Sequence, residues 1–308
     1  MKTALITHRE CLDHITPPGH PEQVARLEYI LDSLKSVDLE RFDARLANYQ
    51  DLLTVHPQIH IDEVIKSVPE NGYRAIDGDT HMSPGSYKAT LRAVGGVLQA
   101  VDMVIAQTVQ NAFVATRPPG HHAERETAMG FCFFGNVAIG AKHALKHHGL
   151  KRVAVVDFDV HHGNGTQDLL WDEPGALFVT SHQSPLWPGT GAQDEKGAHN
   201  NIVNIPLAPH GNGADMRTAY ERFAFPRLEA FEPELILISA GFDAHRSDPL
   251  ADLNWMEEDF FWLTKRLMLL AKKHSKGRLV SVLEGGYDLP ALASSVKVHV
   301  ETLSEITK

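Results

Sequence analysis

The chain has 308 residues, of which 43% are hydrophobic and 22% charged, and its formal net charge is −10. These values are typical of a globular protein with a sizeable core, and the acidic excess disfavours a nucleic-acid backbone as the main partner. Cys11 and Cys132 form neither a disulfide framework nor a metal-binding spacing, which fits a reducing compartment. No apolar run approaches the ~18 residues that cross a membrane, and no secretory leader is visible, so we expect a cytoplasmic protein.

Apolar runs typical of buried strands alternate with helical patterns along the chain. The expected strands are Thr3–Thr7, Ala112–Thr116, Arg152–Val160, Leu177–Thr180, Ile202–Leu207, Leu235–Ala240 and Leu279–Leu283. The clearest expected helices are Pro21–Lys35, Ser86–Gln107, Asn136–His148, Asp215–Phe231, Glu257–His274 and Pro290–Ser304. This alternation predicts βαβ units, and therefore an α/β fold with a mostly parallel sheet that carries helices on both faces. Because no linker interrupts the pattern, we expect one domain over residues 1–308.

Chemically distinctive residues stand at the ends of most of these strands. The segments are Arg117–His122, Asp157–Gly165, Gly241–His245 and Glu284–Tyr287. Since the carboxyl ends of parallel strands meet at one edge of a sheet, these segments are expected to converge on one crevice.

The segment Asp157–Gly165 is the most informative of the four. Asp157, Asp159 and His161 are two residues apart, so an extended strand projects all three from one face. Charges in a buried strand cost several kcal/mol unless they are paired or bind metal. Asp159 and His161 therefore predict two ligands of a divalent metal, and Asp243, which follows another apolar strand, is the expected third. An isolated Asp at such a position more often caps a turn, but three strands that all end in His or Asp favour the metal.

Two adjacent histidines are candidate bases. His121 and His122 follow Pro118-Pro119-Gly120, whose prolines stiffen the turn. We expect Asp157 to orient His121 through a hydrogen bond that favours the imidazolium, and Asn164 to orient His122 without raising its pKa as a carboxylate would. His122 is then the better base near neutral pH, although two structural histidines packed against carbonyls would fit the same pattern.

Aromatic residues in glycine-rich loops complete the candidate site. Gly285-Gly286 lets the backbone approach closely, so the Tyr287 hydroxyl is a candidate donor to an oxyanion; an aromatic cap on a turn fits equally well. Phe131 and Trp187 lie in Gly/Pro-rich loops and would either wall a narrow channel for an aliphatic chain or pack in the core.

Taken in order, these motifs resemble the zinc-dependent histone deacetylase family, in particular its class II members and the bacterial histone deacetylase-like amidohydrolases. The matching segments are Pro17–Gln23, Arg117–His122, Asp157–Thr166, Gly241–Pro249 and Glu284–Tyr287. The resemblance implies a three-layer arginase/deacetylase fold and a hydrolase that removes acetyl or other acyl groups from lysine side chains or similar amines. It also implies that Asp159, His161 and Asp243 hold Zn²⁺, that His121 and His122 are the tandem histidines, and that Tyr287 is the catalytic tyrosine.

The resemblance extends to the rim of the channel and to a second ion. Phe131 and Trp187 would be the hydrophobic walls, and Asp79 the carboxylate that holds the substrate backbone. A structural K⁺ or Na⁺ would be held by the groups that correspond to the family's monovalent cation site, which are Asp157, Asp159, the carbonyl of His161, and Thr180-Ser181.

Two positions bear on the subclass and on rival functions. Asn164 stands where class I members carry Asp, which favours class II, and Leu250 stands where polyamine-selective relatives carry an acidic gatekeeper. An acetylpolyamine substrate is thus disfavoured but stays open. An arginase-like ureohydrolase would need a two-metal, carboxylate-rich site, and a non-catalytic binder would not need the full set of catalytic residues. The sequence leaves the acyl group, the amine and a homo-oligomer open, with Pro188–His199 as a surface segment that could mediate contacts.

Overall fold

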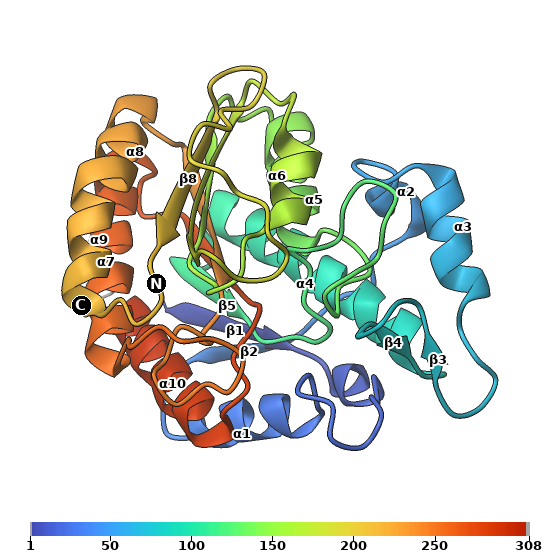
Figure 1. The fold of residues 1–308 in the computed structure, drawn as a ribbon. Helices are drawn as coiled ribbons and strands as arrows, with labels where there is room; N and C mark the ends of the chain where they lie inside the picture. The colour runs from blue at the N-terminus through green and yellow to red at the C-terminus, as the bar shows by residue number, and fades with distance from the viewer. Residues whose placement is uncertain (1, 306–308) are drawn as a thin grey trace.

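An eight-stranded sheet forms the centre of the protein in the computed structural model, which describes residues 2–305 (Figure 1). Its strands are β1 (Thr3–Thr7), β2 (Glu40–Asp43), β5 (Asn111–Val114), β6 (Val153–Asp157), β7 (Ala176–Gln183), β8 (Ile202–Leu207), β9 (Leu235–Ala240) and β10 (Leu279–Leu283). Their order is β2-β1-β5-β10-β9-β6-β7-β8, and every pairing is parallel. The predicted α/β class with a parallel sheet is confirmed.

Helices cover both faces of the sheet. The α-helices of the described residues are α1 (Ala25–Ser33), α2 (Tyr49–Leu52), α3 (Gln58–Lys66), α4 (Ser86–Ile105), α5 (Asn136–Lys146), α6 (Asn164–Leu170), α7 (Gly213–Ala219), α8 (Phe225–Phe231), α9 (Glu257–His274) and α10 (Leu289–Glu305). In β9, Ile236 and Ile238 pack with α9 and α10, while Leu235 and Leu237 pack with α4 and α5. A strand buried on both sides reads as a continuous apolar run, which is the pattern of Leu235–Ala240.

The segment of residues 49–82, which precedes α4 in the chain, forms a small projection. It contains α2, α3 and the antiparallel hairpin β3 (Arg74–Ala75) and β4 (His81–Met82), which stand together away from α9 and α10 in Figure 1. Among residues 2–305, no helix combines the length and the apolar character that crossing a bilayer requires.

Two predicted boundaries are wrong for identifiable reasons. The strand expected over Arg152–Val160 ends at Asp157, because Asp157 Oδ1 accepts a hydrogen bond from the Asp159 N–H at 3.1 Å and Asp159 Oδ1 accepts one from the His161 N–H at 2.9 Å. These side-chain-to-backbone bonds curl the chain out of the sheet, so Asp159 and His161 lie in a turn rather than on one face of a strand. The helix expected over Asp215–Phe231 is divided by a π-helical turn, Tyr220–Ala224, just before Pro226, whose ring cannot follow a regular helical turn.

Candidate active site

Three side chains from two neighbouring strand ends form a metal-binding group. The ligand atoms of Asp159, His161 and Asp243 all lie within 4.8 Å of one another. His161 Nδ1 is 3.2 Å from Asp159 Oδ1 and 3.1 Å from Asp243 Oδ2. Ligands bound to zinc at 2.0–2.1 Å in tetrahedral geometry are about 3.3 Å apart, so these atoms already have the spacing that the ion requires.

The backbone around this group leaves room for the carboxylates of Asp159 and Asp243 and fixes their orientation. A Cβ on Gly241 would lie 2.0 Å from Asp159 Oδ2, and one on Gly285 would lie 2.3 Å from Asp243 Oδ2. The N–H of Gly285 donates to Asp159 Oδ2 at 2.8 Å, and the N–H of Val160 donates to Asp243 Oδ1 at 2.8 Å. Any larger residue at these two glycines would displace a carboxylate from the group.

The electrostatics of the group favour a cation. Burial opposes protonation of His161, but hydrogen bonds to Asp159 and Asp243 outweigh it and raise the pKa of His161 to about 10. Burial and the charge of Asp159 raise the pKa of Asp243 to about 7. One imidazole therefore does not fully balance the negative charge of two buried carboxylates. A borderline divalent ion such as Zn²⁺ suits both this charge and the oxygen and nitrogen donors.

The tandem histidines have different partners. His121 Nδ1 is 3.0 Å from Asp157 Oδ2, and His122 Nδ1 is 2.8 Å from Asn164 Oδ1. Asn164 Nδ2 donates to Glu124 Oε1 at 2.7 Å, and a carboxylate can only accept, so the Asn164 oxygen faces His122. His122 therefore carries its proton on Nδ1, which leaves Nε2 as an acceptor.

The two histidines also differ in acidity. Burial lowers the pKa of His121, but the charges of Asp159 and Asp157 outweigh this effect and hold it well above the usual value. Burial and the neighbouring His121 and His161 hold the pKa of His122 well below the usual value. At neutral pH the pair thus consists of one imidazolium and one neutral imidazole.

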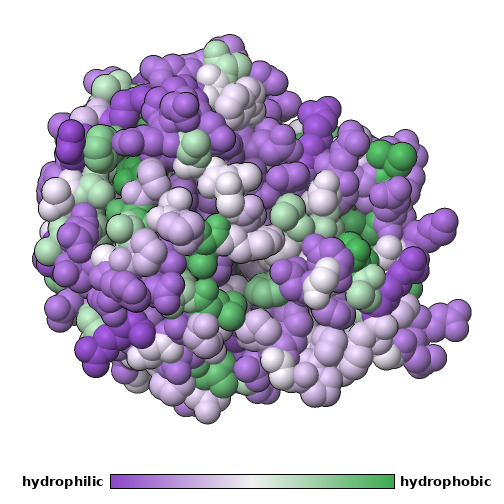
Figure 2. Space-filling view, in the orientation of Figure 1, coloured by the Kyte–Doolittle hydropathy of each residue, from purple (hydrophilic) through white to green (hydrophobic). Residues whose placement is uncertain are grey.

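A cavity of about 400 Å³ opens above the metal-binding group. Residues from several loops line it, namely His20, Pro21, Gly78, Asp79, His81, His122, Gly130, Phe131, His161, Leu186, Trp187, Leu250 and Tyr287. The predicted channel and rim residues thus face one space. Figure 2 shows hydrophobic residues bordering a small hollow near the centre of the pictured face, while hydrophilic residues cover most of the rest.

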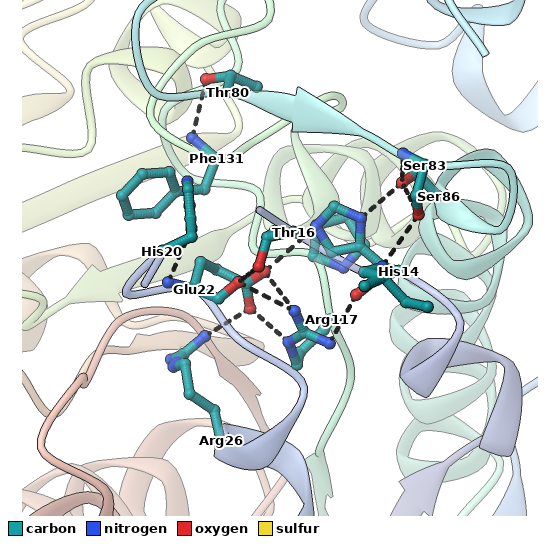
Figure 3. A network of polar contacts seen from close by, with 12 residues as sticks. His14, Thr16, His20, Glu22, Arg26, Thr80, Ser83, Ser86, Arg117 and Phe131 are labelled. Carbon is teal, nitrogen blue, oxygen red and sulfur yellow. Dashed lines mark hydrogen bonds and ion pairs between the residues drawn. The ribbon is translucent and has the colours of Figure 1, made fainter. Parts of the chain in front are cut away.

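Phe131 and Tyr287 both line this cavity, and a backbone hydrogen bond holds each of them in place. Their ring centroids are 5.8 Å apart at an interplanar angle of 79°. The N–H of Phe131 donates to Thr80 Oγ1 at 3.1 Å (Figure 3), and the N–H of Tyr287 donates to Asp248 Oδ2 at 2.7 Å. Phe131 has a φ of 68°, a strained conformation that such backbone contacts stabilise.

The monovalent-cation residues of the sequence analysis lie beside the same strands. Asp157 of β6 pairs in register with Thr180 of β7. The Oγ1 of Thr180 is buried and has no hydrogen-bond partner among residues 2–305, whereas Ser181 Oγ lies 2.9 Å from the Tyr220 hydroxyl.

A buried network of charged residues supports the site. The sequence motifs did not predict it. Glu22 accepts from Arg117 Nε at 2.5 Å and Nη2 at 2.6 Å, and also contacts Arg26 at 3.0 Å and His14 at 3.2 Å (Figure 3). Arg26 in turn donates to the carbonyls of Glu284 and Gly286 and places its guanidinium 4.9 Å from the Tyr287 ring centroid. A charged residue at a strand end, Arg117, is the feature of the sequence that could have indicated this network. Its partner, Glu22, is 95 residues away in the chain.

Glu284 is a second supporting residue without a role in the sequence analysis. Its Oε2 accepts from the N–H groups of Gly120 and His121 at 2.7 and 3.2 Å, and its Oε1 accepts from Ser239 at 3.1 Å. The end of β10 therefore holds the turn that presents the tandem histidines.

Comparison with known proteins gives one consistent result. A family model described as the histone deacetylase domain matches residues 20–303. An uncharacterized protein of Synechocystis is 42% identical over 98% of this chain and 99% of its own length, and the histone deacetylase-like amidohydrolase of Pseudomonas aeruginosa is 39% identical over 89% and 74%. The human polyamine deacetylase HDAC10 is 37% identical over 98% of this chain and 48% of its own length. The crystal structure of the HDA15 HD domain has a TM-score of 0.91 and 32% identity, and the match covers 98% of this chain and 90% of that one.

Proposed function

The chain belongs to the histone deacetylase family and is a deacetylase or amidohydrolase of that family, and on this premise we propose that it hydrolyses the acyl-amide bond of acyl-lysine side chains or closely similar amines. One observation carries the proposal. His161 of the metal-binding group, the neutral imidazole of His122 and the ring of Tyr287 all line a single cavity with apolar walls.

We propose that Asp159, His161 and Asp243 hold Zn²⁺, which, when bound, supplies a Lewis acid at the base of the cavity. His122 Nε2 accepts the proton of the attacking water, since Asn164 keeps the other ring nitrogen protonated. Asp157 holds His121 as the imidazolium, which provides positive charge and a proton for the leaving amine. The Tyr287 hydroxyl donates to the oxyanion of the tetrahedral intermediate.

The walls and the rim support an extended aliphatic substrate. Phe131 and Trp187 would flank the aliphatic chain of the acylated amine, and Asp79 would accept hydrogen bonds from the backbone of a peptide substrate. An acetylpolyamine is the second candidate, because a polyamine deacetylase is among the relatives. Leu250 lines the cavity and offers no charge to a second ammonium group, which favours acyl-lysine.

A structural K⁺ or Na⁺ is proposed beside the catalytic group. Asp157, Asp159, the His161 carbonyl, Thr180 and Ser181 would supply oxygen atoms, and the unpartnered hydroxyl of Thr180 supports an ion there. We also propose that residues 1–308 act as one catalytic domain, since the family match covers residues 20–303. The two unpaired, buried cysteines support a cytoplasmic location.

The test compares acetyl-lysine peptides, acetylated polyamines and longer acyl-lysine peptides in parallel, each with and without a chelator. The proposal expects chelator-sensitive turnover that is fastest on an acyl-lysine peptide. Faster turnover of the acetylated polyamine would replace the substrate assignment, and binding without turnover of any of these compounds would contradict the proposed hydrolysis.

A further inference from the structure

A second group of potential metal ligands lies where the C-terminal end of α5 meets α4. The ligand atoms of His143, His147 and His148 are all within 4.8 Å of one another. His143 Nε2 and His148 Nε2 lie 2.6 and 2.7 Å from the same atom, Oδ1 of Asp102 in α4. Asp102 of α4 thus contacts two of the three histidines, and none of the four side chains takes part in the proposed hydrolysis.

The end of the helix explains the convergence. His143 and His147 are one turn apart, and their rings stack with centroids 4.7 Å apart and an interplanar angle of 9°. The N–H groups of both His147 and His148 point to the carbonyl of His143, at 2.8 and 3.3 Å, so the last turn widens and brings the His148 ring to the same side. That ring stands at 88° to each of the other two, so the His148 nitrogen approaches from a different direction than the nitrogens of the stacked pair.

The carboxylate of the group is held in place. Arg45 Nη1 contacts Oδ2 of Asp102 at 2.9 Å and leaves Oδ1 to the histidines. The ordinary benefit of a cationic histidine at a helix C-terminus requires neither three imidazoles in contact nor a shared carboxylate oxygen.

This group is separate from the active site. Helix α5 begins at Asn136, whose amide donates to the carbonyl of Pro118 just before the tandem histidines, and ends beside the histidine group. Its 11 residues span ~16 Å, so the two groups lie at opposite ends of one helix.

We propose that His143, His147, His148 and Asp102 form a surface site for one Zn²⁺ ion, which ties α5 to α4. The three imidazoles would supply three ligands. Asp102 Oδ1, which now accepts hydrogen bonds from His143 and His148, would supply the fourth ligand of a structural zinc once the ion replaces those two bonds. Since Cu²⁺ binds such nitrogen-rich sites more tightly than Zn²⁺, it serves as a spectroscopic probe of the same ligands.

Zinc content at a fixed free zinc concentration tests the site in the full-length chain. Relative to the wild type, the variant His143→Ala/His147→Ala should bind about one zinc fewer, and the same pair of substitutions in an Asp159→Ala background should also remove about one. His274→Ala is the matched control, because His274 also ends a helix and contacts a carboxylate, Glu229, but belongs to no group of potential metal ligands among residues 2–305. It should bind zinc as the wild type does, and all of these variants except those with Asp159→Ala should keep wild-type turnover.

The background variant separates this inference from the proposed active-site zinc. If Asp159→Ala changes nothing but the histidine pair still removes one zinc, the surface site stands and the active-site assignment fails. Zinc should raise the Tm of Asp159→Ala and not that of the triple variant, and Cu²⁺ bound to Asp159→Ala should give an EPR spectrum with several nitrogen couplings. An unchanged zinc content in His143→Ala/His147→Ala, with its helicity intact by circular dichroism, would overturn the proposal.

Discussion

Replacing Gly130 with alanine tests how tightly the cavity holds the proposed base. An added Cβ would lie 2.6 Å from Cδ2 of His122 and 2.5 Å from Cη2 of Trp187. Ordinary contact begins at 3.4 Å, so His122 would have to move by about 0.8 Å unless the backbone yields. A displacement of that size in a catalytic group costs ~100-fold in rate, and we expect kcat for an acetyl-lysine peptide to fall by about that factor.

The matched control is Gly149→Ala. Both glycines have positive φ, 56° and 68°, but an added Cβ at Gly149 meets nothing within 4 Å. Each alanine therefore costs roughly 1–2 kcal/mol of backbone strain, and only the one at Gly130 intrudes on His122. A rate loss confined to Gly130→Ala, with both variants folded at the assay temperature, would support the reasoning. Equal kcat values for the two variants would refute it.

Three further predictions concern other parts of the structure. Tyr287→Phe should lower kcat by ~10²–10³ with the zinc content unchanged, because it removes only the oxyanion donor; full kcat would exclude that role. Glu22→Gln should destabilise the fold by roughly 3–5 kcal/mol in a denaturant titration, since it leaves the buried guanidinium of Arg117 without its charge partner; a loss below 1 kcal/mol would contradict this. Burial lowers the pKa of His56 and of His299 to about 3, so the folded state binds fewer protons than the unfolded state below the unfolded pKa of 6.5. Stability should therefore fall as the pH drops through 6.5 toward 3, by ~1.4 kcal/mol per pH unit for each histidine, and His299→Gln should reduce that slope by one proton.

The sequence predicts the fold wherever periodicity and capping agree. The predicted helix Glu257–His274 has the observed bounds of α9, because Asp259 binds the N–H of Met256 at its start and a regular apolar stripe faces the sheet. The strands β9 and β10 also have their predicted bounds, since each is a short, mostly apolar run buried on both faces. The edge strand β8 has its predicted bounds as well, although its Pro206 is exposed. Shorter elements such as α2, with four residues, carry too little periodicity to be recognised.

The candidate site was predictable where neighbouring strand ends carry the residues. Asp159, His161 and Asp243 could be grouped because parallel strands end at one edge, even though the expected strand geometry around Asp159 was wrong. The contact between His122 and Asn164 likewise follows from residue types at adjacent loops. The network around Glu22 could not be predicted in the same way, because its ion pair joins the segment before α1 to the loop after β5, 95 residues away in the chain.

The central claim is that Asp159, His161 and Asp243 share one zinc ion on which hydrolysis depends. The most direct measurement is an anomalous difference map at the zinc absorption edge, from crystals of a preparation whose acyl-lysine turnover has been measured. The account predicts a peak within ~2.0–2.2 Å of ligand atoms from all three residues in the active preparation. An active preparation with no peak between these side chains would contradict it.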